Sequence, residues 1–219
     1  MTAPHSPRRT IALAAAIAWL VGTPVPPASL RPAQQPDPLA ARAKGRPRAP
    51  VLVYEMADFQ CPACRQFFVS TLPTIEQDYI RTGKVRWVFV NYPLTQLHPN
   101  AAAAAELAMC AARQGRFWPM HDLLYRHQPE WAPLPDPGGY FRTLGADSAG
   151  LRADSLAVCV TSRATAAEVE QDAAAARRAG ANATPSFYIE GGLLSGAWPV
   201  ADFRRVLDSI YLAKTAGSR

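Results

Sequence analysis

Two cysteines separated by two residues, Cys61 and Cys64, are the side chains in this sequence best suited to do chemistry. They lie in the segment DFQCPAC, which follows a short apolar run at residues 51–56 and continues as a helix-forming stretch. A sulfur at the N-terminus of a helix faces unpaired N–H groups and the positive end of the helix dipole, which favours the thiolate. Cys61 is therefore predicted to be the nucleophile, and Cys64, one turn further on, to resolve a mixed disulfide.

The alternative roles for this cysteine pair are half of a zinc site and a purely structural bridge. A zinc site would need a second pair of closely spaced ligands, but the other two cysteines are isolated and no histidine pair has ligand spacing. Thiol–disulfide exchange is thus the preferred chemistry, with no metal or other cofactor expected. His98, His121 and His127 are assigned structural roles and no part in catalysis.

The elements that must position the cysteines begin with a strand at residues 51–56, a helix over 61–79 and a strand at 85–92. A strand, a helix and a second strand in this order predict a βαβ unit with parallel strands. Residues 98–162 are expected to be wholly helical, and a long helix follows over 163–179. The chain then returns to β structure in a hairpin over 184–198 and ends in an amphipathic helix at 200–212.

The net charge of +6 arises entirely in the first 50 residues, which hold seven of the 23 basic residues and one of the 17 acidic ones. The remaining chain has 16 of each and is neutral, which argues against a nucleic-acid-binding protein.

The N-terminal residues have the pattern of a targeting segment. Arg8 and Arg9 precede an apolar run from Ile11 to Val21, so residues 1–28 are predicted to be a cleaved export signal. An uncleaved membrane anchor is the alternative, and the two arginines weakly resemble a twin-arginine signal. Residues 24–50 contain eight prolines, and residues 29–50 are expected to be a disordered linker. The protein is accordingly expected in the periplasm or another extracytoplasmic compartment.

Three separated blocks carry a family resemblance: EMADFQCPACRQFF, QGRFWPMHDLLYRHQ and ATPSFYIEGGLLSGAW. In this order they resemble the DsbA-like branch of the thioredoxin superfamily, over about residues 51–213. The resemblance implies an α/β protein in which a thioredoxin fold, residues 51–92 and 163–213, is interrupted by an inserted α-helical domain, residues 93–162.

The resemblance also implies roles for individual residues. Thr184-Pro185 matches the family's cis-proline dipeptide, which lies against the cysteines and presents backbone hydrogen bonds to a bound substrate; a trans proline that starts a strand is the alternative. Pro62 and Ala63, between the cysteines, are expected to contact substrate together with Thr184. Ala63 stands where the best-known periplasmic oxidases have a histidine, which suggests a less extreme thiol pKa and weaker oxidising power.

Glu55 lies six residues before Cys61, where the family carries a buried acid. A poorly solvated carboxylate has a raised pKa and could carry the proton of Cys64. A surface glutamate at the edge of a strand is the alternative.

Cys110 and Cys159 are predicted to form a structural disulfide within the helical insertion. They are the cysteines that remain once the redox pair is set aside, and exported proteins meet an oxidising compartment. Some DsbA-like relatives carry a second bridge between the corresponding helices. Two separate buried thiols are the alternative.

The predicted function is that of an exported thiol-disulfide oxidoreductase, in the first place an oxidase that donates its disulfide to exported client proteins. The resemblance implies reoxidation by a membrane partner of the DsbB or vitamin K epoxide reductase type. A reductase or isomerase of the same fold and a non-catalytic holdase or metal-binding module are the alternatives. A monomer is expected, because residues 24–50 are too poor in apolar residues for a dimerisation domain.

Overall fold

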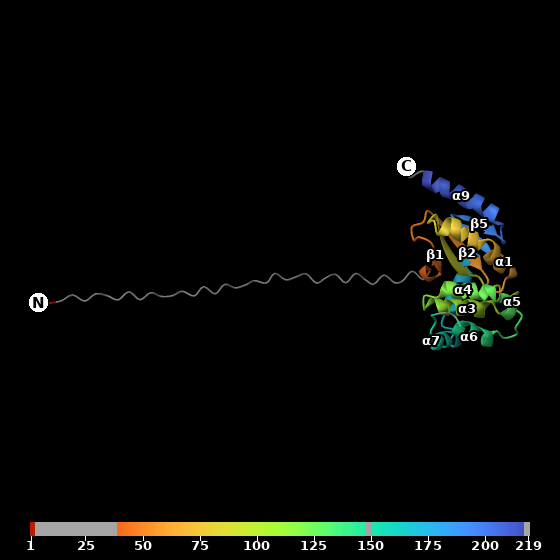
Figure 1. Ribbon diagram of the computed structural model, residues 1–219, viewed down its shortest axis with the longest axis horizontal. Helices are drawn as coiled ribbons and strands as arrows, with labels where there is room; N and C mark the ends of the chain where they lie inside the picture. Colours follow the sequence, from red (N-terminus) through yellow and green to blue (C-terminus); the bar gives the residue numbers. More distant parts are fainter. Residues whose placement is uncertain (3–38, 148–149, 217–219) are drawn as a thin grey trace. The chain divides into compact units, whose positions relative to one another are not determined.

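The computed structural model describes residues 1–2, 39–147 and 150–216, and Figure 1 shows its ribbon. Apart from its first two residues, the predicted export signal lies outside the described residues, as does the linker up to residue 38. Among the helices that are described, none is long and apolar enough to cross a membrane.

The described chain alternates between one sheet and the helices around it. In chain order the elements are the 3-10 turn η1 (Ala40–Arg42), β1 (Ala43–Lys44), β2 (Val51–Ala57), α1 (Pro62–Ser70), α2 (Leu72–Ile75), the π-helical turn η2 (Glu76–Ile80), β3 (Val85–Asn91), α3 (Ala101–Ala112), α4 (Phe117–Arg126), α5 (Gln128–Trp131), α6 (Gly138–Asp147), α7 (Ala153–Thr161), α8 (Ala166–Arg178), β4 (Ser186–Ile189), β5 (Gly192–Ser195) and α9 (Val200–Ala216).

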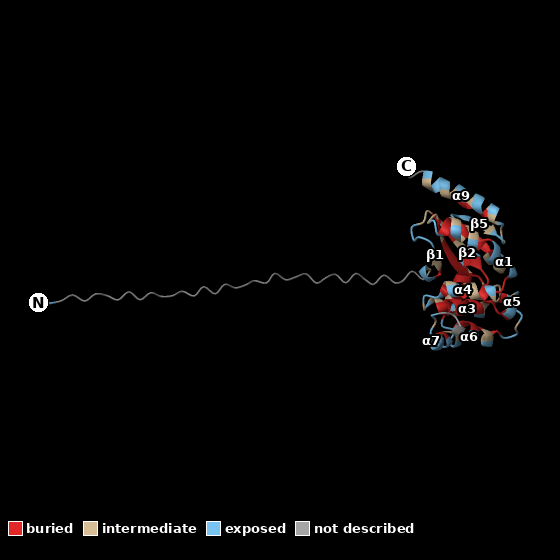
Figure 2. Ribbon diagram, viewed as in Figure 1, coloured by how far each residue is buried: buried red, intermediate tan, exposed pale blue. Residues whose placement is uncertain are grey.

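The sheet has the strand order β1-β3-β2-β4-β5, with β2 at its centre. The parallel pairing predicted for the βαβ unit is confirmed, since β2 and β3 run parallel from Val51 opposite Val85 to Ala57 opposite Asn91. The predicted hairpin is also confirmed: β4 and β5 are antiparallel, and β4 pairs with β2. β2 is covered on both faces, which explains why its sequence is almost continuously apolar; Figure 2 shows most of this strand in red, and Leu52 and Tyr54 are half-buried.

Helices pack against the sheet in separate apolar groups. Phe67 of α1 and Phe203 of α9 pack with Val53 and Trp87 in one core. A second core joins α3 and α4 to Phe59, Cys61 and Cys64. The helical insertion and the sheet are therefore held together by a core that reaches the predicted redox site, so the insertion is in a position to influence it.

The predicted continuous helix over residues 61–79 is wrong in detail. α1 ends at Ser70, and the chain continues through α2 and η2. Pro73 explains part of this interruption, because its ring nitrogen has no hydrogen to donate to the preceding turn.

The predicted disordered linker is wrong for residues 39–50, which are part of the folded unit. β1 pairs antiparallel with β3, with Ala43 opposite Val88. Arg42 is 3% exposed; it donates to the Phe89 carbonyl at 3.3 Å and forms an ion pair with Asp172 of α8. The low apolar content of this segment did not indicate that it belongs to the folded unit, because a buried ion pair and backbone pairing hold it in place instead of apolar side chains.

Candidate redox site

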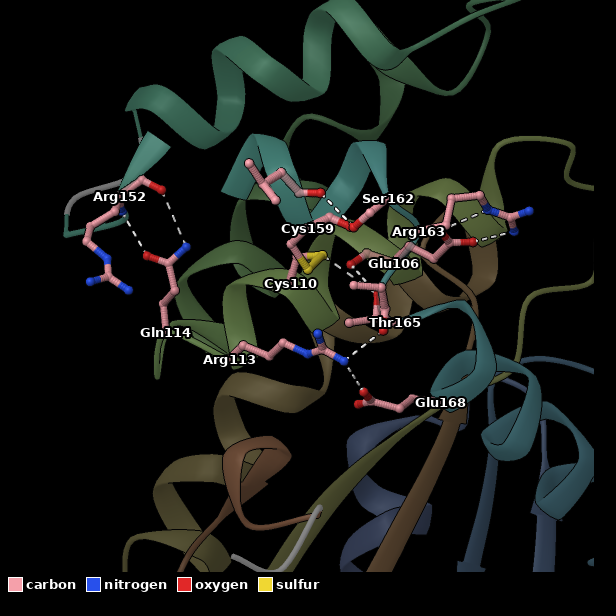
Figure 3. The surroundings of a disulfide bond; sticks show 12 residues. Glu106, Cys110, Arg113, Gln114, Arg152, Cys159, Ser162, Arg163, Thr165 and Glu168 are labelled. Carbon is pink, nitrogen blue, oxygen red and sulfur yellow. Dashed lines mark hydrogen bonds and ion pairs between the residues drawn. A yellow bond between two sulfur atoms is a disulfide. The ribbon is translucent and has the colours of Figure 1, made fainter. Parts of the chain in front are cut away.

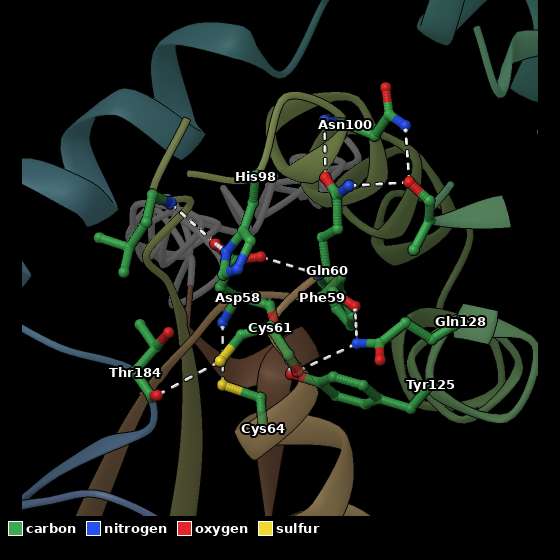
Figure 4. A network of polar contacts seen from close by, with 12 residues as sticks. Asp58, Phe59, Gln60, Cys61, Cys64, His98, Asn100, Tyr125, Gln128 and Thr184 are labelled. Carbon is green, nitrogen blue, oxygen red and sulfur yellow. Dashed lines mark hydrogen bonds and ion pairs between the residues drawn. The ribbon is translucent and has the colours of Figure 1, made fainter. Parts of the chain in front are cut away.

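Cys61 and Cys64 lie at the start of α1, as the sequence indicated. Cys61 is the N-cap residue, with the extended backbone angles φ −70° and ψ 123°, and Pro62 begins the helix. Both cysteines are free thiols, and Figure 4 shows their sulfur atoms next to each other. Cys61 is 7% exposed and Cys64 is fully buried, so Cys61 is the more exposed of the two thiols.

The surroundings of the two thiols drive their pKa values apart. The hydrogen bond from the Cys64 thiol contributes most to lowering the pKa of Cys61 to about 6, and the backbone N–H groups of Ala63 and Cys64 add to it. Burial raises the pKa of Cys64 well above its usual value, and the neighbouring Cys61 raises it further. At neutral pH Cys61 is therefore a thiolate while Cys64 holds its proton.

The Thr184-Pro185 peptide bond is cis, and it lies against the cysteines. The Cys61 sulfur lies 3.3 Å from the Thr184 carbonyl oxygen, to which it donates when it is protonated, and β4 begins immediately after Pro185. Pro62 is exposed and Ala63 half-buried on the first turn of α1. The geometry thus brings Thr184 to Cys61 and leaves Pro62 open to a bound molecule.

Glu55 is a buried side chain on the central strand β2, 1% exposed. The indole N–H of Trp87 donates to its Oε2 at 2.8 Å. Burial raises the pKa of Glu55 to about 7, although the bond from Trp87 opposes the rise. Burial raises the pKa of Tyr125 well above its usual value, and nearby groups that include Cys64 and Glu55 add to the rise. Glu55 can therefore gain or lose a proton near physiological pH.

Sequence reasoning missed a set of polar residues around the cysteines, shown in Figure 4: Asp58, Gln60, Asn100 and Gln128. The Asp58 carboxylate is fully buried; it accepts from Nδ1 of His98 at 2.8 Å and from the backbone N–H groups of Gln60 and Leu94 at 2.7 and 2.8 Å. The backbone N–H of Asp58 in turn donates to the Cys64 sulfur at 3.5 Å. The sequence did contain a signal for this set, namely the polar residues Asp58 and Gln60 just before the cysteines. Polar residues next to a buried strand need hydrogen-bond partners.

Cys110 of α3 and Cys159 of α7 are joined by a disulfide, with their Cα atoms 5.8 Å apart. Figure 3 shows that this bond lies between two helices of the insertion. It is flanked by the Cys110–Thr165 contact and by the ion pair between Arg163 and Glu106. The redox pair takes no part in it.

No group of three or more His, Cys, Asp or Glu side chains is arranged to hold a metal ion within the part of the chain that the structure describes. His121 is buried among aromatic rings, and its Nδ1 pairs with Asp122.

A parallel βαβ unit, an antiparallel hairpin and a thiol pair facing a cis proline define a thioredoxin-fold protein with an inserted helical region. The chain belongs to the thioredoxin family, because the family model described as Thioredoxin matches residues 39–209. The predicted fold class and the predicted family are confirmed.

Known proteins of two kinds are similar to this chain. The Na(+)/H(+) antiporter NhaA 3 of Salinispora tropica is 38% identical over 155 residues, which are 71% of this chain and 22% of that protein. Disulfide bond formation protein D of Bacillus subtilis is 26% identical over 176 residues, 80% of this chain and 78% of that protein. The chain spans only 22% to 30% of the antiporters that it matches.

Among solved structures, alpha-DsbA1 of Wolbachia pipientis matches with a TM-score of 0.72 at 24% identity, covering 81% of this chain and 94% of that one. At this level of identity the likeness shows the fold.

Proposed function

We propose that this protein is an exported thiol-disulfide oxidoreductase that forms disulfides in client proteins through its Cys-Pro-Ala-Cys site. The observation that carries the proposal is the contrast between the two thiols at the start of α1. Cys61 keeps a small exposed fraction and has a pKa of about 6, whereas Cys64 is fully buried and has a raised pKa. This contrast suits an exchange in which one sulfur meets the client and the other resolves the intermediate.

In the proposed reaction the protein starts with Cys61 and Cys64 joined. A client thiolate attacks the Cys61 sulfur, the Cys61–Cys64 bond breaks, and Cys64 leaves as a thiolate. A second client thiolate then attacks the client sulfur of the mixed disulfide, and Cys61 leaves with the electron pair. The client is oxidised by two electrons and the protein is reduced to its dithiol form. A sulfur of low pKa is the better leaving group, so the surroundings of Cys61 favour release of the oxidised client.

Glu55 and the Thr184-Pro185 segment have distinct proposed roles. Because the pKa of Cys64 is raised, its thiolate must gain a proton on leaving, and Glu55, with a pKa of about 7, is the proposed donor. The Thr184-Pro185 backbone is proposed to bind an extended client segment over Cys61, with Pro62 and Ala63 as the remaining contacts.

The cellular setting is part of the proposal. The basic and apolar pattern at residues 8–21 supports export, and the Bacillus subtilis relative is named for disulfide bond formation. A monomer that is reoxidised by a membrane partner of the DsbB or vitamin K epoxide reductase type completes the cycle. A membrane anchor at residues 1–28 is the alternative to signal cleavage. Ala63 stands between the cysteines at the position where a histidine would stabilise the Cys61 thiolate and increase the oxidising power. Because that histidine is absent, a reductase is the second candidate function.

Trapping of the intermediate tests the roles of the two cysteines. With Cys64→Ser, the Cys61 thiolate should attack client proteins that already hold a disulfide, one client sulfur leaves as a thiolate, and the clients should accumulate as mixed disulfides through Cys61, visible on a non-reducing gel. The matched control Cys61→Ser should trap none. If Cys61→Ser traps clients and Cys64→Ser does not, the assignment of the two thiols is reversed.

The direction of exchange needs a separate measurement. The oxidised protein should restore activity to a reduced, unfolded ribonuclease, and thiol alkylation of cell extracts should find Cys61 and Cys64 joined. A predominantly reduced pair in cells, together with reduction of insulin and no oxidation of ribonuclease, would establish a reductase instead.

A further inference from the structure

The segment that carries Cys61 is held by side chains of the helical insertion, and one of these contacts the nucleophile's own residue. Gln128 is the first residue of α5 and is 5% exposed. Its Nε2 donates to the carbonyl oxygen of Phe59 at 2.7 Å and to that of Cys61 at 3.0 Å. One amide group thus binds the backbone on both sides of Gln60, directly before α1, as Figure 4 shows.

A second amide fastens the same segment. The Oε1 of Gln60 accepts from the backbone N–H of Asn100 at 2.7 Å, and its Nε2 donates to the Ala132 carbonyl at 2.9 Å. Asn100 also donates to the carbonyls of Ala132 and Leu134 at 3.3 and 2.8 Å. The start of α3 and the end of α5 are thereby linked to the segment before the cysteines.

Besides holding the backbone, these hydrogen bonds reach Cys61, the residue whose side-chain charge changes in the reaction. The Cys61 carbonyl accepts two hydrogen bonds, one from Arg65 N–H at 3.1 Å within α1 and one from Gln128. The carbonyl dipole points its negative end at these donors, and the amide hydrogens of Gln128 bring partial positive charge to the residue that carries the thiolate. Removing Gln128 would lose this charge and loosen the backbone that holds Cys61 at the helix N-terminus.

We infer that Gln128 is a positioning residue for the redox reaction, through which the helical insertion stabilises the thiolate form of Cys61. The inference rests on the proposed function and deepens it, since a more stable thiolate makes the disulfide more oxidising toward clients. Gln128 acts through the backbone and touches neither client nor sulfur.

The variant that tests this is Gln128→Met, which keeps the length of the side chain and removes both hydrogen bonds. Gln114→Met is the matched control: Gln114 also lies in the insertion and bonds the Arg152 backbone, at 2.8 Å through Oε1 and 3.4 Å through Nε2 (Figure 3), but the Cys61 segment is not among its partners. Three quantities are measured on the full chain: thiolate absorbance at ultraviolet wavelengths against pH, the equilibrium constant with glutathione, and the urea midpoint of unfolding.

For Gln128→Met we expect the thiolate titration of Cys61 to move to higher pH and the disulfide to become less oxidising by about threefold to tenfold in the glutathione equilibrium constant. Gln114→Met should leave both unchanged. A lower urea midpoint for Gln128→Met with an unaltered titration and an unaltered equilibrium constant would show a merely structural role and overturn the inference.

Should Gln128→Met fail to fold, Gln128→His, which keeps one N–H donor, is measured instead. A smaller shift of the same sign is then expected, and no shift overturns the inference. Failure of the proposed function is recognised separately, because it is read from the wild-type protein: absence of ribonuclease oxidation by the wild type refutes the oxidase role, whereas the Cys61 titration of the Gln128 variants decides the positioning role.

Discussion

Replacing Glu55 by glutamine should stabilise the reduced protein at pH 8 and leave its stability nearly unchanged at pH 4. Glu55 is fully buried, and the cost of burying its charge raises its pKa from 4.5 to about 7. The folded state therefore binds this proton more tightly than the unfolded state does. Stability from this group is at its greatest below pH 4.5, falls as the pH rises, and reaches its lowest level above about pH 7.

The size of the effect follows from the pKa shift. A rise from 4.5 to about 7 corresponds to about 3 kcal/mol of unfolding free energy lost between the two limits. Glutamine has nearly the same shape, carries no charge, and can still accept the Trp87 hydrogen bond through its amide oxygen. Glu55→Gln should therefore gain up to about 3 kcal/mol over the wild type at pH 8, with the gain shrinking toward zero at pH 4.

Urea unfolding of the dithiol form at pH 4, 6 and 8 measures this difference. Glu168→Gln is the control, because Glu168 pairs with Arg113 at the surface and its change should stay within about 1 kcal/mol at each of the three values. A Glu55→Gln variant with the same stability difference from the wild type at pH 4 and pH 8 would refute the raised pKa.

The same variant tests the proposed proton donor. Glu55→Gln cannot supply a proton to Cys64, so the first client attack on Cys61, in which Cys64 leaves, should slow and lose its pH dependence near pH 7. The second step, in which a client thiolate releases Cys61 and Cys64 takes no part, should keep its rate. Unchanged turnover from pH 5 to pH 8 would remove Glu55 from the mechanism.

Three further predictions follow from the geometry. Alkylation of the reduced protein by iodoacetamide should occur at Cys61 with an apparent pKa of about 6, and titration near 9 would contradict the stabilised thiolate. Replacing both Cys110 and Cys159 by alanine should lower the unfolding free energy by about 4 kcal/mol in the chain-entropy account and leave thiol exchange intact; equal urea midpoints would show that the bridge adds no stability. Arg42→Leu should destabilise by about 3 kcal/mol, because it leaves the Asp172 carboxylate buried without its cation, and a change below 1 kcal/mol would show that residues 39–50 are weakly held.

Much of the redox site could be predicted from the chain itself, since its defining features are local. The spacing of Cys61 and Cys64 and the helix-compatible Pro62 place both sulfurs on one turn at a helix start, whatever surrounds them. The βαβ unit and the hairpin follow from short-range patterns in the same way. The family resemblance added Glu55 and Pro185, which no local pattern distinguishes from an ordinary strand residue and an ordinary proline.

Tertiary structure alone decided the contacts between distant parts of the chain. Arg42 meets Asp172 across 130 positions, and Gln128 meets Cys61 across 67. The burial that raises the pKa of Glu55 likewise depends on strands and helices packed from both sides of the sheet. Periodicity and composition report which way a side chain faces within its own element, whereas a partner far along the chain is chosen by how the elements pack. The sequence therefore indicates which sulfurs react, and the folded structure determines their pKa values and what holds them in place.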